Sequence, residues 1–195
     1  MDLFISVDVG TTNWKVGAFT SDGTLVSIKK TPTLTHFTDD GSGFYCPNEL
    51  WEAICSLLKS LTDELSTHRI VTITCTGMAE SMVALDENDE TVGNVIAWFD
   101  TKAVKHTHKI IEAFGEETIF GITGLDISPI FSLPKLMAIK TSHRFDFDRA
   151  VKWLQLPEFI SYRLSGIALT DYSLACRTML FDIRQNNWSQ PLLDY

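Results

Sequence analysis

The segment ISVDVGTTNWKVGAF, which begins at Ile5, constrains the fold of this chain more than any other part of its sequence. Apolar and β-branched residues alternate from Leu3 to Val9, and a second run of this kind covers Trp14 to Thr20. Both runs predict strands, and the small polar residues between them predict a tight turn that begins at Gly10. The chain is therefore expected to start as an antiparallel pair of strands joined by a glycine turn.

The elements that follow predict a mixed sheet with helices. Ser21-Asp22-Gly23 is typical of a hairpin turn and leads to a third strand, so the first thirty residues read as a β-meander. Further predicted elements are a surface loop over 31–46, a helix from Pro47 to Leu65, strands at 70–75, 82–85 and 95–98, and helices at 102–114, 132–142 and 157–164. This order favours an α/β fold with an antiparallel edge over a doubly wound nucleotide-binding fold.

Composition excludes several classes of protein. Hydrophobic residues make up 45% of the 195 residues, which is too many for a disordered chain. Asp and Glu number 25 against 16 Lys and Arg, and the net charge of -9 argues against nucleic acid or an anionic membrane as the main partner. The four cysteines form no Cys-x-x-Cys pair, and no run approaches the roughly 20 apolar residues of a membrane span. We expect a cytoplasmic protein with reduced cysteines.

The glycine turn also has the chemistry of an anion site. Asp8 lies near the end of an apolar strand, Gly10 permits a sharp turn, and the next residues offer hydroxyl, amide and main-chain donors. A carboxylate beside such a turn can hold a hydrated magnesium ion, which usually keeps several waters. The predicted phosphate- and magnesium-binding residues are Asp8, Gly10, Thr11, Thr12, Asn13 and Lys15. An ordinary hairpin turn with capping side chains is the alternative, and the pattern alone leaves both open.

Four stretches of the sequence carry a resemblance to a known family. VDVGTTNWKVGAFTSDG resembles the first phosphate motif of the actin, Hsp70 and sugar kinase superfamily. TGMAESMVALDENDETVGNVIAWFDTKA, GITGLDISPIFSLPKLMAIK and FISYRLSGIALTDYSLACRTMLFDI resemble successive regions of its FGGY carbohydrate kinase branch. The resemblance is collinear over almost the whole chain. It implies a ribonuclease-H-like mixed sheet with antiparallel edge strands and flanking helices, and ATP- and Mg²⁺-dependent phosphorylation of a sugar, ketose, polyol or sugar acid.

The resemblance also implies roles for the residues at the glycine turn. Asp8 would organise the magnesium ion through water, and the residues from Gly10 to Asn13 would face the transferred phosphate. Lys15 matches a basic residue that contacts the phosphates in that family. Phosphoryl transfer depends mainly on positioning and on electrostatic stabilisation of the phosphoryl oxygens, so hydrogen-bond donors, a cation and a metal suit it.

Substrate-binding residues are implied in the second matched region. They are Glu80, Trp98, Asp100 and Lys102. Each carboxylate oxygen can accept hydrogen bonds from adjacent sugar hydroxyls, and a Trp face can pack against sugar C–H groups. The alternatives are a solvated loop carboxylate for Glu80, a core position for Trp98, and an N-cap role for Asp100 in a helix that begins near Lys102. Lys102 stands where the family usually has Arg, so a bidentate contact would be lost.

Departures from the family pattern bear on the substrate. Glycerol kinases have Arg at the position of Ala79 and Tyr at the position of Ile130, so the resemblance argues against glycerol. Xylulokinases have Met-His-Gly where this chain has Ala79-Glu80-Ser81, which argues against plain xylulokinase activity. Another ketose, a polyol or a sugar acid is expected, and the sequence does not identify the hydroxyl that is phosphorylated.

The resemblance also implies how the chain is organised. Residues 1–195 would form the sugar- and phosphate-binding N-terminal lobe of a kinase, with a sheet-rich part over 1–100 and a more helical part over 101–195. The family's general base and second lobe would follow Tyr195, so we expect an incomplete lobe that is inactive alone and able to self-associate. Asp171 and Asp182 are expected to be structural. The alternative is a non-catalytic sugar-binding or regulatory module.

Overall fold

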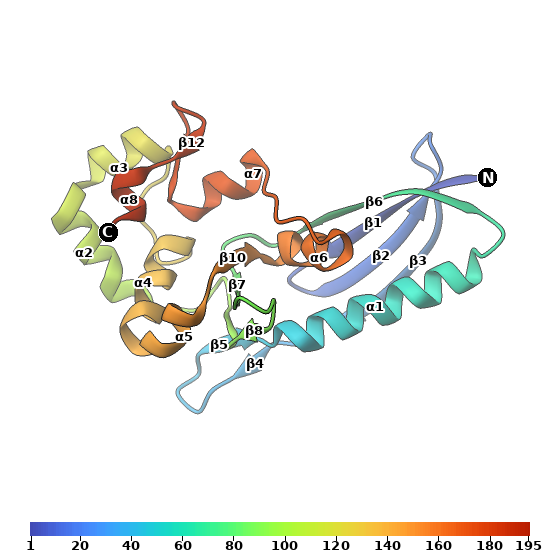
Figure 1. Cartoon of the computed structure of the whole chain (residues 1–195), viewed down its shortest axis with the longest axis horizontal. Coiled ribbons are helices and arrows are strands. Elements are labelled where there is room, and N and C mark those ends of the chain that lie inside the picture. Colours follow the sequence, from blue (N-terminus) through green and yellow to red (C-terminus); the bar gives the residue numbers. More distant parts are fainter.

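The computed structural model describes residues 1–195, and its largest sheet has the strand order β3-β2-β1-β6. These strands are β1 (Asp2–Val9), β2 (Asn13–Phe19), β3 (Leu25–Pro32) and β6 (Arg69–Gly77). β2 pairs antiparallel with both β1 and β3, whereas β6 pairs parallel with β1 (Figure 1). The predicted meander and the mixed sheet with an antiparallel edge are therefore confirmed.

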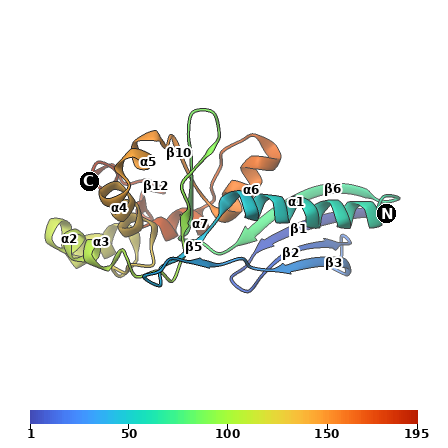
Figure 2. The same ribbon diagram turned by 90° about the horizontal axis from the view of Figure 1, so that it is seen from below.

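Two helices cover one face of this sheet. They are α1 (Pro47–Glu64) and α6 (Leu156–Ser165), and Figure 2 shows both on the same side of the strands. The apolar stripe of α1 packs over β2 and β3, whereas α6 packs over β6 and β1, and Phe159 of α6 joins the same core. Successive side chains of a strand point to opposite faces, so Asp8 lies on the face of β1 away from these helices. The alternation that builds the core thus leaves Asp8 accessible.

The rest of the chain forms small sheets and a second, helical core. The further strands are β4 (His36–Phe37), β5 (Gly43–Tyr45), β7 (Met82–Leu85), β8 (Thr91–Val92), β9 (Val95–Ile96), β10 (Lys152–Gln155), β11 (Phe181–Asp182) and β12 (Asn187–Trp188). The further helices are α2 (Val104–Phe114), α3 (Glu116–Thr123), α4 (Ser132–Ser142), α5 (Arg144–Arg149), α7 (Tyr172–Ala175), the 3₁₀ turn Cys176–Thr178 and α8 (Gln190–Leu193). None of the helices is long and apolar enough to cross a membrane.

Several elements were not predicted, among them the helices α3 and α5 and the strands of two segments. The expected surface loop over 31–46 contains β4 and β5, which pair with each other, and β5 also pairs with β9. The strand β10 is not predicted by the sequence pattern, and it pairs antiparallel with β7. β5 and β10 each pair with a strand distant in the sequence, and each is too short for its own residues to show a clear period. The prediction of a plain loop was wrong for this reason.

Gly77 allows the ends of β1 and β6 to approach closely. A Cβ atom at this position would lie 2.5 Å from the carbonyl oxygen of Val9, and the glycine φ is +155°. The next N–H group, that of Met78, donates to the same carbonyl at 2.9 Å. The segment that leads from β6 to Glu80 is thereby held beside the glycine turn.

We expect Gly77→Ala to lower the free energy of unfolding by about 1–3 kcal/mol, because the added methyl group overlaps main-chain atoms that cannot move aside. Urea unfolding of both proteins measures the change. Gly121→Ala is the matched control: Gly121 lies within α3 with no atom within 4 Å of the place a methyl group would take, and alanine is favoured there. Equal stability of Gly77→Ala and the parent chain would contradict this packing argument.

Candidate functional site

The glycine turn lies where the carboxyl ends of two parallel strands meet. Val9 at the end of β1 pairs with Gly77 at the end of β6. A Cβ atom at Gly10 would lie 2.9 Å from the carbonyl oxygen of Asn13, so the turn requires glycine. Thr33, just after β3, anchors the turn, since its hydroxyl donates to the Gly10 carbonyl at 2.7 Å. The two residues that follow Gly10, both threonines, are exposed to solvent.

Asp8 and Lys15 form an ion pair across the strands on either side of this turn. They are direct partners in the β1–β2 register, and Lys15 Nζ lies 2.6 Å from Asp8 Oδ2. The side chains are 33% exposed for Asp8 and 37% for Lys15, so the pair is open to solvent rather than internal. Asp8 Oδ1 has no hydrogen-bond partner. The predicted anion and cation are thus adjacent, with one carboxylate oxygen free for another ligand.

These residues fit a hydrated magnesium ion better than a protein-enclosed one. No three Asp, Glu, His or Cys side chains cluster closely enough to hold a metal ion by themselves. Mg²⁺ commonly takes one or two protein carboxylates and completes its octahedron with waters and substrate phosphates. Asp8 Oδ1 can supply one such ligand, directly or through water.

Glu80 lies in a strongly constrained loop between β6 and β7. Its φ of +65° places it in the left-handed region, which is uncommon for a residue other than glycine. Its N–H donates to Gln155 Oε1 at 2.9 Å, and its carbonyl accepts from Lys135 Nζ at 3.2 Å. The Arg177 Nε and Nη2 groups both lie 2.5 Å from Glu80 Oε1. Glu80 is therefore a buried and paired residue, and the alternative of a solvated loop carboxylate is wrong.

Three partners of Glu80 were not predicted from the sequence. Gln155 precedes α6, Lys135 belongs to α4, and Arg177 belongs to the 3₁₀ turn Cys176–Thr178. The Arg177 guanidinium also lies over the ring of Phe131, 4.8 Å from its centroid. Lys135 and Arg177 both fall inside stretches that carry the family resemblance, but no local spacing connects them to Glu80. Their role becomes visible only in the folded chain.

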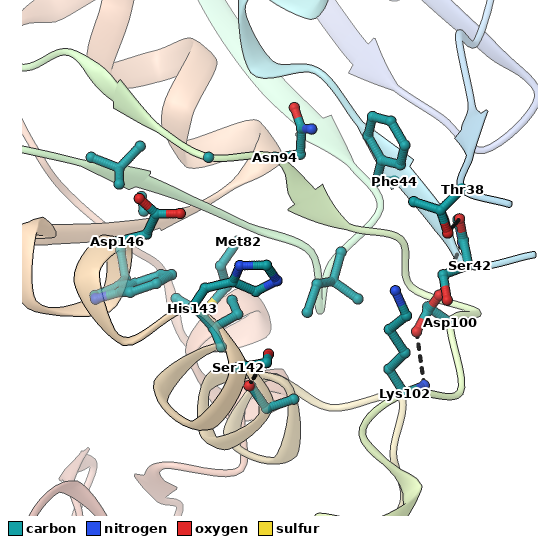
Figure 3. A pocket seen from close by; sticks show the side chains of 18 of the residues that line it. Thr38, Ser42, Phe44, Met82, Asn94, Asp100, Lys102, Ser142, His143 and Asp146 are labelled. Atoms are coloured by element: carbon teal, nitrogen blue, oxygen red, sulfur yellow. Dashed lines mark hydrogen bonds between the residues drawn. The ribbon is translucent and has the colours of Figure 1, made fainter. Parts of the chain in front are cut away.

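Asp100 is buried, and both of its carboxylate oxygens accept main-chain hydrogen bonds. The Gly43 N–H donates to Oδ2 at 2.9 Å and the Lys102 N–H donates to Oδ1 at 2.8 Å (Figure 3). Asp100 thus joins the β4–β5 hairpin to the turn that precedes α2. The N-cap alternative is wrong, because α2 begins at Val104 and its N-cap is Ala103, whereas Asp100 accepts hydrogen bonds within the preceding turn. A sugar-binding role for Asp100 stays a prediction.

Trp98 and Lys102 flank this turn. The Trp98 residue is 37% exposed and packs edge-to-face with Phe99 at 5.7 Å, so the core alternative for Trp98 is wrong. Lys102 Nζ lies 3.4 Å from Asp40 Oδ2 in an exposed ion pair. The Trp98 side chain remains available to a ligand, and the Lys102 ammonium is partly engaged.

A cavity of about 640 Å³ lies beside this turn, between the β4–β5 hairpin, strands β7 to β9 and the carboxyl end of α4. Asp100 and Lys102 line it together with Phe44, His143 and Asp146, as Figure 3 shows. The carboxylates of the glycine turn and of the loop between β6 and β7 do not line it. The predicted residues therefore occupy three places: the glycine turn, the Glu80 loop and the edge of this cavity.

The late carboxylates have structural roles, as predicted. Asp171 caps α7, because its Oδ1 accepts the Leu174 N–H at 3.0 Å. Asp182 Oδ1 accepts the N–H groups of Arg184 and Gln185 at 2.9 and 3.0 Å.

Relatives of the chain are carbohydrate kinases. Gluconokinase from Bacillus subtilis (strain 168) is 26% identical over 189 residues, which cover 97% of this chain and 37% of that protein. Xylulose kinase from Staphylococcus xylosus is 25% identical over 193 residues, covering 99% of this chain and 40% of that protein. The chain thus spans well under half the length of these relatives.

The fold agrees with solved structures of the same group. The ligand-bound xylulose kinase from Lactobacillus acidophilus superimposes with a TM-score of 0.91 at 26% identity, over 100% of this chain and 39% of that one. Residues 3–195 match the N-terminal domain of the FGGY family of carbohydrate kinases. The predicted resemblance and fold class are confirmed, and the chain belongs to the FGGY family of carbohydrate kinases.

Proposed function

We propose that this chain is the sugar- and phosphate-binding lobe of an ATP-dependent carbohydrate kinase. The observation that carries the proposal is the anchored Gly10 turn at the carboxyl ends of β1 and β6, with the open Asp8–Lys15 pair beside it. The Glu80 loop leaves β6 at the same edge. A phosphate site and a polyol receptor on neighbouring loops are what transfer of a phosphoryl group to a sugar requires.

On the phosphate side, the donors of residues 10–13 would orient the transferred group, and Lys15 would add positive charge. Asp8 would hold magnesium through its free Oδ1, and the bound ion would neutralise charge on the phosphate oxygens. These groups act by position and charge and form no covalent bond to the phosphate. We propose structural roles rather than a general-base role for Asp171 and Asp182, because Oδ1 of each carboxylate accepts main-chain hydrogen bonds.

On the sugar side, Glu80 and Trp98 are the proposed contacts. Arg177 binds Glu80 Oε1 and leaves Oε2 without a protein partner, so Oε2 can accept a hydrogen bond from a hydroxyl. Trp98 can pack against the C–H face of a ring or chain. Asp100 and Lys102 would then shape the loop, with Asp100 acting through its main-chain hydrogen bonds. The proposed substrates are a ketose, a polyol or a sugar acid, rather than glycerol.

Calorimetry of this chain with gluconate, xylulose, other ketoses, polyols and glycerol, with and without Mg-ATP, tests the proposal. Saturable binding of one sugar class is the expected result. Absence of binding to the whole panel, together with absence of Mg-ATP binding, would contradict it. Sugar binding without turnover by the complete protein of which we propose this chain is a part would instead support a non-catalytic sugar-binding module.

Glu80→Gln is expected to weaken binding of that sugar by about tenfold, because a charge-assisted hydrogen bond becomes a neutral one. The same calorimetric titration measures the loss. Glu112→Gln, at an exposed position of α2, is the matched control and should bind as the parent chain does. An unchanged affinity in Glu80→Gln would remove Glu80 from the proposed sugar site.

A further inference from the structure

Lys135 is a buried lysine that joins two segments far apart in the sequence. Its side chain extends from the first turns of α4, and the residue is 3% exposed. Nζ lies 3.2 Å from the carbonyl oxygen of Glu80 and 3.1 Å from that of Trp98. One ammonium group therefore holds both segments that carry the proposed sugar contacts.

Burial of the Lys135 ammonium is costly, and the charges that face it offset only part of that cost. Glu80 and Asp100 are the charged groups that face it, and neither carboxylate forms an ion pair with Nζ. Burial lowers the pKa of Lys135 to about 8, while the two carboxylates act in the opposite direction. Removing an ammonium from water is unfavourable unless it is fully paired, so stability alone does not explain a lysine here.

We infer that Lys135 is a positioning residue of the sugar site, whose ammonium sets the spacing between the Glu80 loop and the Trp98 turn by binding both main-chain carbonyls. The expected effect of Lys135 on sugar affinity rests on the proposed function. The coupling of the two segments rests only on the contacts that Lys135 makes. Misplacement of a binding group by about 1 Å is enough to cost a large factor in activity.

The test compares Lys135→Met and Lys135→Arg with the parent chain. Methionine keeps the length of the side chain but donates no hydrogen bond, whereas arginine keeps the charge and the donors. Lys140→Met, on the same helix and away from Glu80, is the matched control. Two quantities are measured on the full chain: hydrogen exchange of residues 79–82 and 97–101, and calorimetric affinity for the sugar found in the panel.

We expect Lys135→Met to speed exchange in both segments and to weaken sugar binding by about tenfold or more. Lys135→Arg should restore most of both properties, and Lys140→Met should change neither. Should Lys135→Met fail to fold, the pH dependence of Lys135→Arg decides the test. The sugar affinity of the parent chain should fall as pH rises through about 8, because the Lys135 ammonium loses its proton. The sugar affinity of Lys135→Arg should not show that fall, because the guanidinium stays charged.

The outcomes separate this inference from the proposed function. If the parent chain binds sugar, and Lys135→Met has the same hydrogen exchange and the same sugar affinity as the parent, the positioning role is overturned and the proposed function is left intact. Faster exchange in both segments, in a chain that binds no sugar, would support the coupling and contradict the function. Faster exchange in only one segment would also overturn the inference, because a positioning residue must act on both.

Discussion

Asp8→Ala is expected to abolish phosphoryl transfer by the complete kinase of which we propose this chain is a part, while sugar affinity stays unchanged. The substitution removes the free carboxylate oxygen beside the glycine turn that we propose as the magnesium ligand. Loss of a preorganised electrostatic contact to the transferred group typically costs about 10³-fold in kcat. ADP release measures turnover, and calorimetry measures sugar binding.

The surroundings of Asp8 also provide the controls for this experiment. The Asp8–Lys15 pair is partly open to solvent, where ion pairs contribute little to stability, so we expect Asp8→Ala to lose turnover without unfolding. Asp2→Ala removes another paired carboxylate from the same strand, far from the turn, and should leave turnover unchanged. Normal turnover in Asp8→Ala would rule out the proposed magnesium role.

The second large effect concerns stability at alkaline pH. The pKa of Lys135 falls from the ordinary lysine value of 10.5 to about 8 because the amine is buried. Between these values the unfolded chain holds a proton that the folded chain has released, so folding becomes more favourable as pH rises. The stabilisation is complete above 10.5 and is lost as pH falls to about 8. A shift of this size corresponds to about 3 kcal/mol.

Urea unfolding of the parent chain and of Lys135→Met at several pH values from about 7.5 to about 10.5 measures this effect. The difference between their unfolding free energies should grow in favour of the parent as pH rises. Other groups that titrate at alkaline pH, such as Cys75 with a pKa of about 11, are common to both chains and cancel. A difference that stays constant with pH would contradict the burial of a charged Lys135.

Several elements were predicted well from local sequence. The helix over 132–142 and the strand over 82–85 have the predicted bounds, and the apolar stripe that begins at Leu50 packs into the core. Short elements were missed: β4, β5 and β10 span two to four residues, and their main-chain partners lie in other short strands, several of them distant in the sequence. Such strands form because the edge of another strand is available for pairing. The periodicity of residues within the segment does not indicate whether such an edge is present.

For the candidate site, the residue types were predictable and their surroundings were not. Asp8, Gly10 and Glu80 were identified from motif positions, and the roles proposed for them await experiment. The sequence offered no reason to connect Glu80 with its later partners on α4, before α6 and in the 3₁₀ turn, which lie 55, 75 and 97 residues further along the chain. It also left open whether Asp100 meets a ligand or main-chain N–H groups.

The sequence by itself determined the meander, the long amphipathic helix, the glycine turn and the family, because these depend on patterns within a few neighbouring residues or on collinear motifs. Only the tertiary structure decided which groups surround Glu80, that Lys135 is buried, and that both oxygens of Asp100 are occupied. Hydrogen bonds and burial depend on distances in space, and packing brings together segments whose spacing along the chain carries no record of that contact.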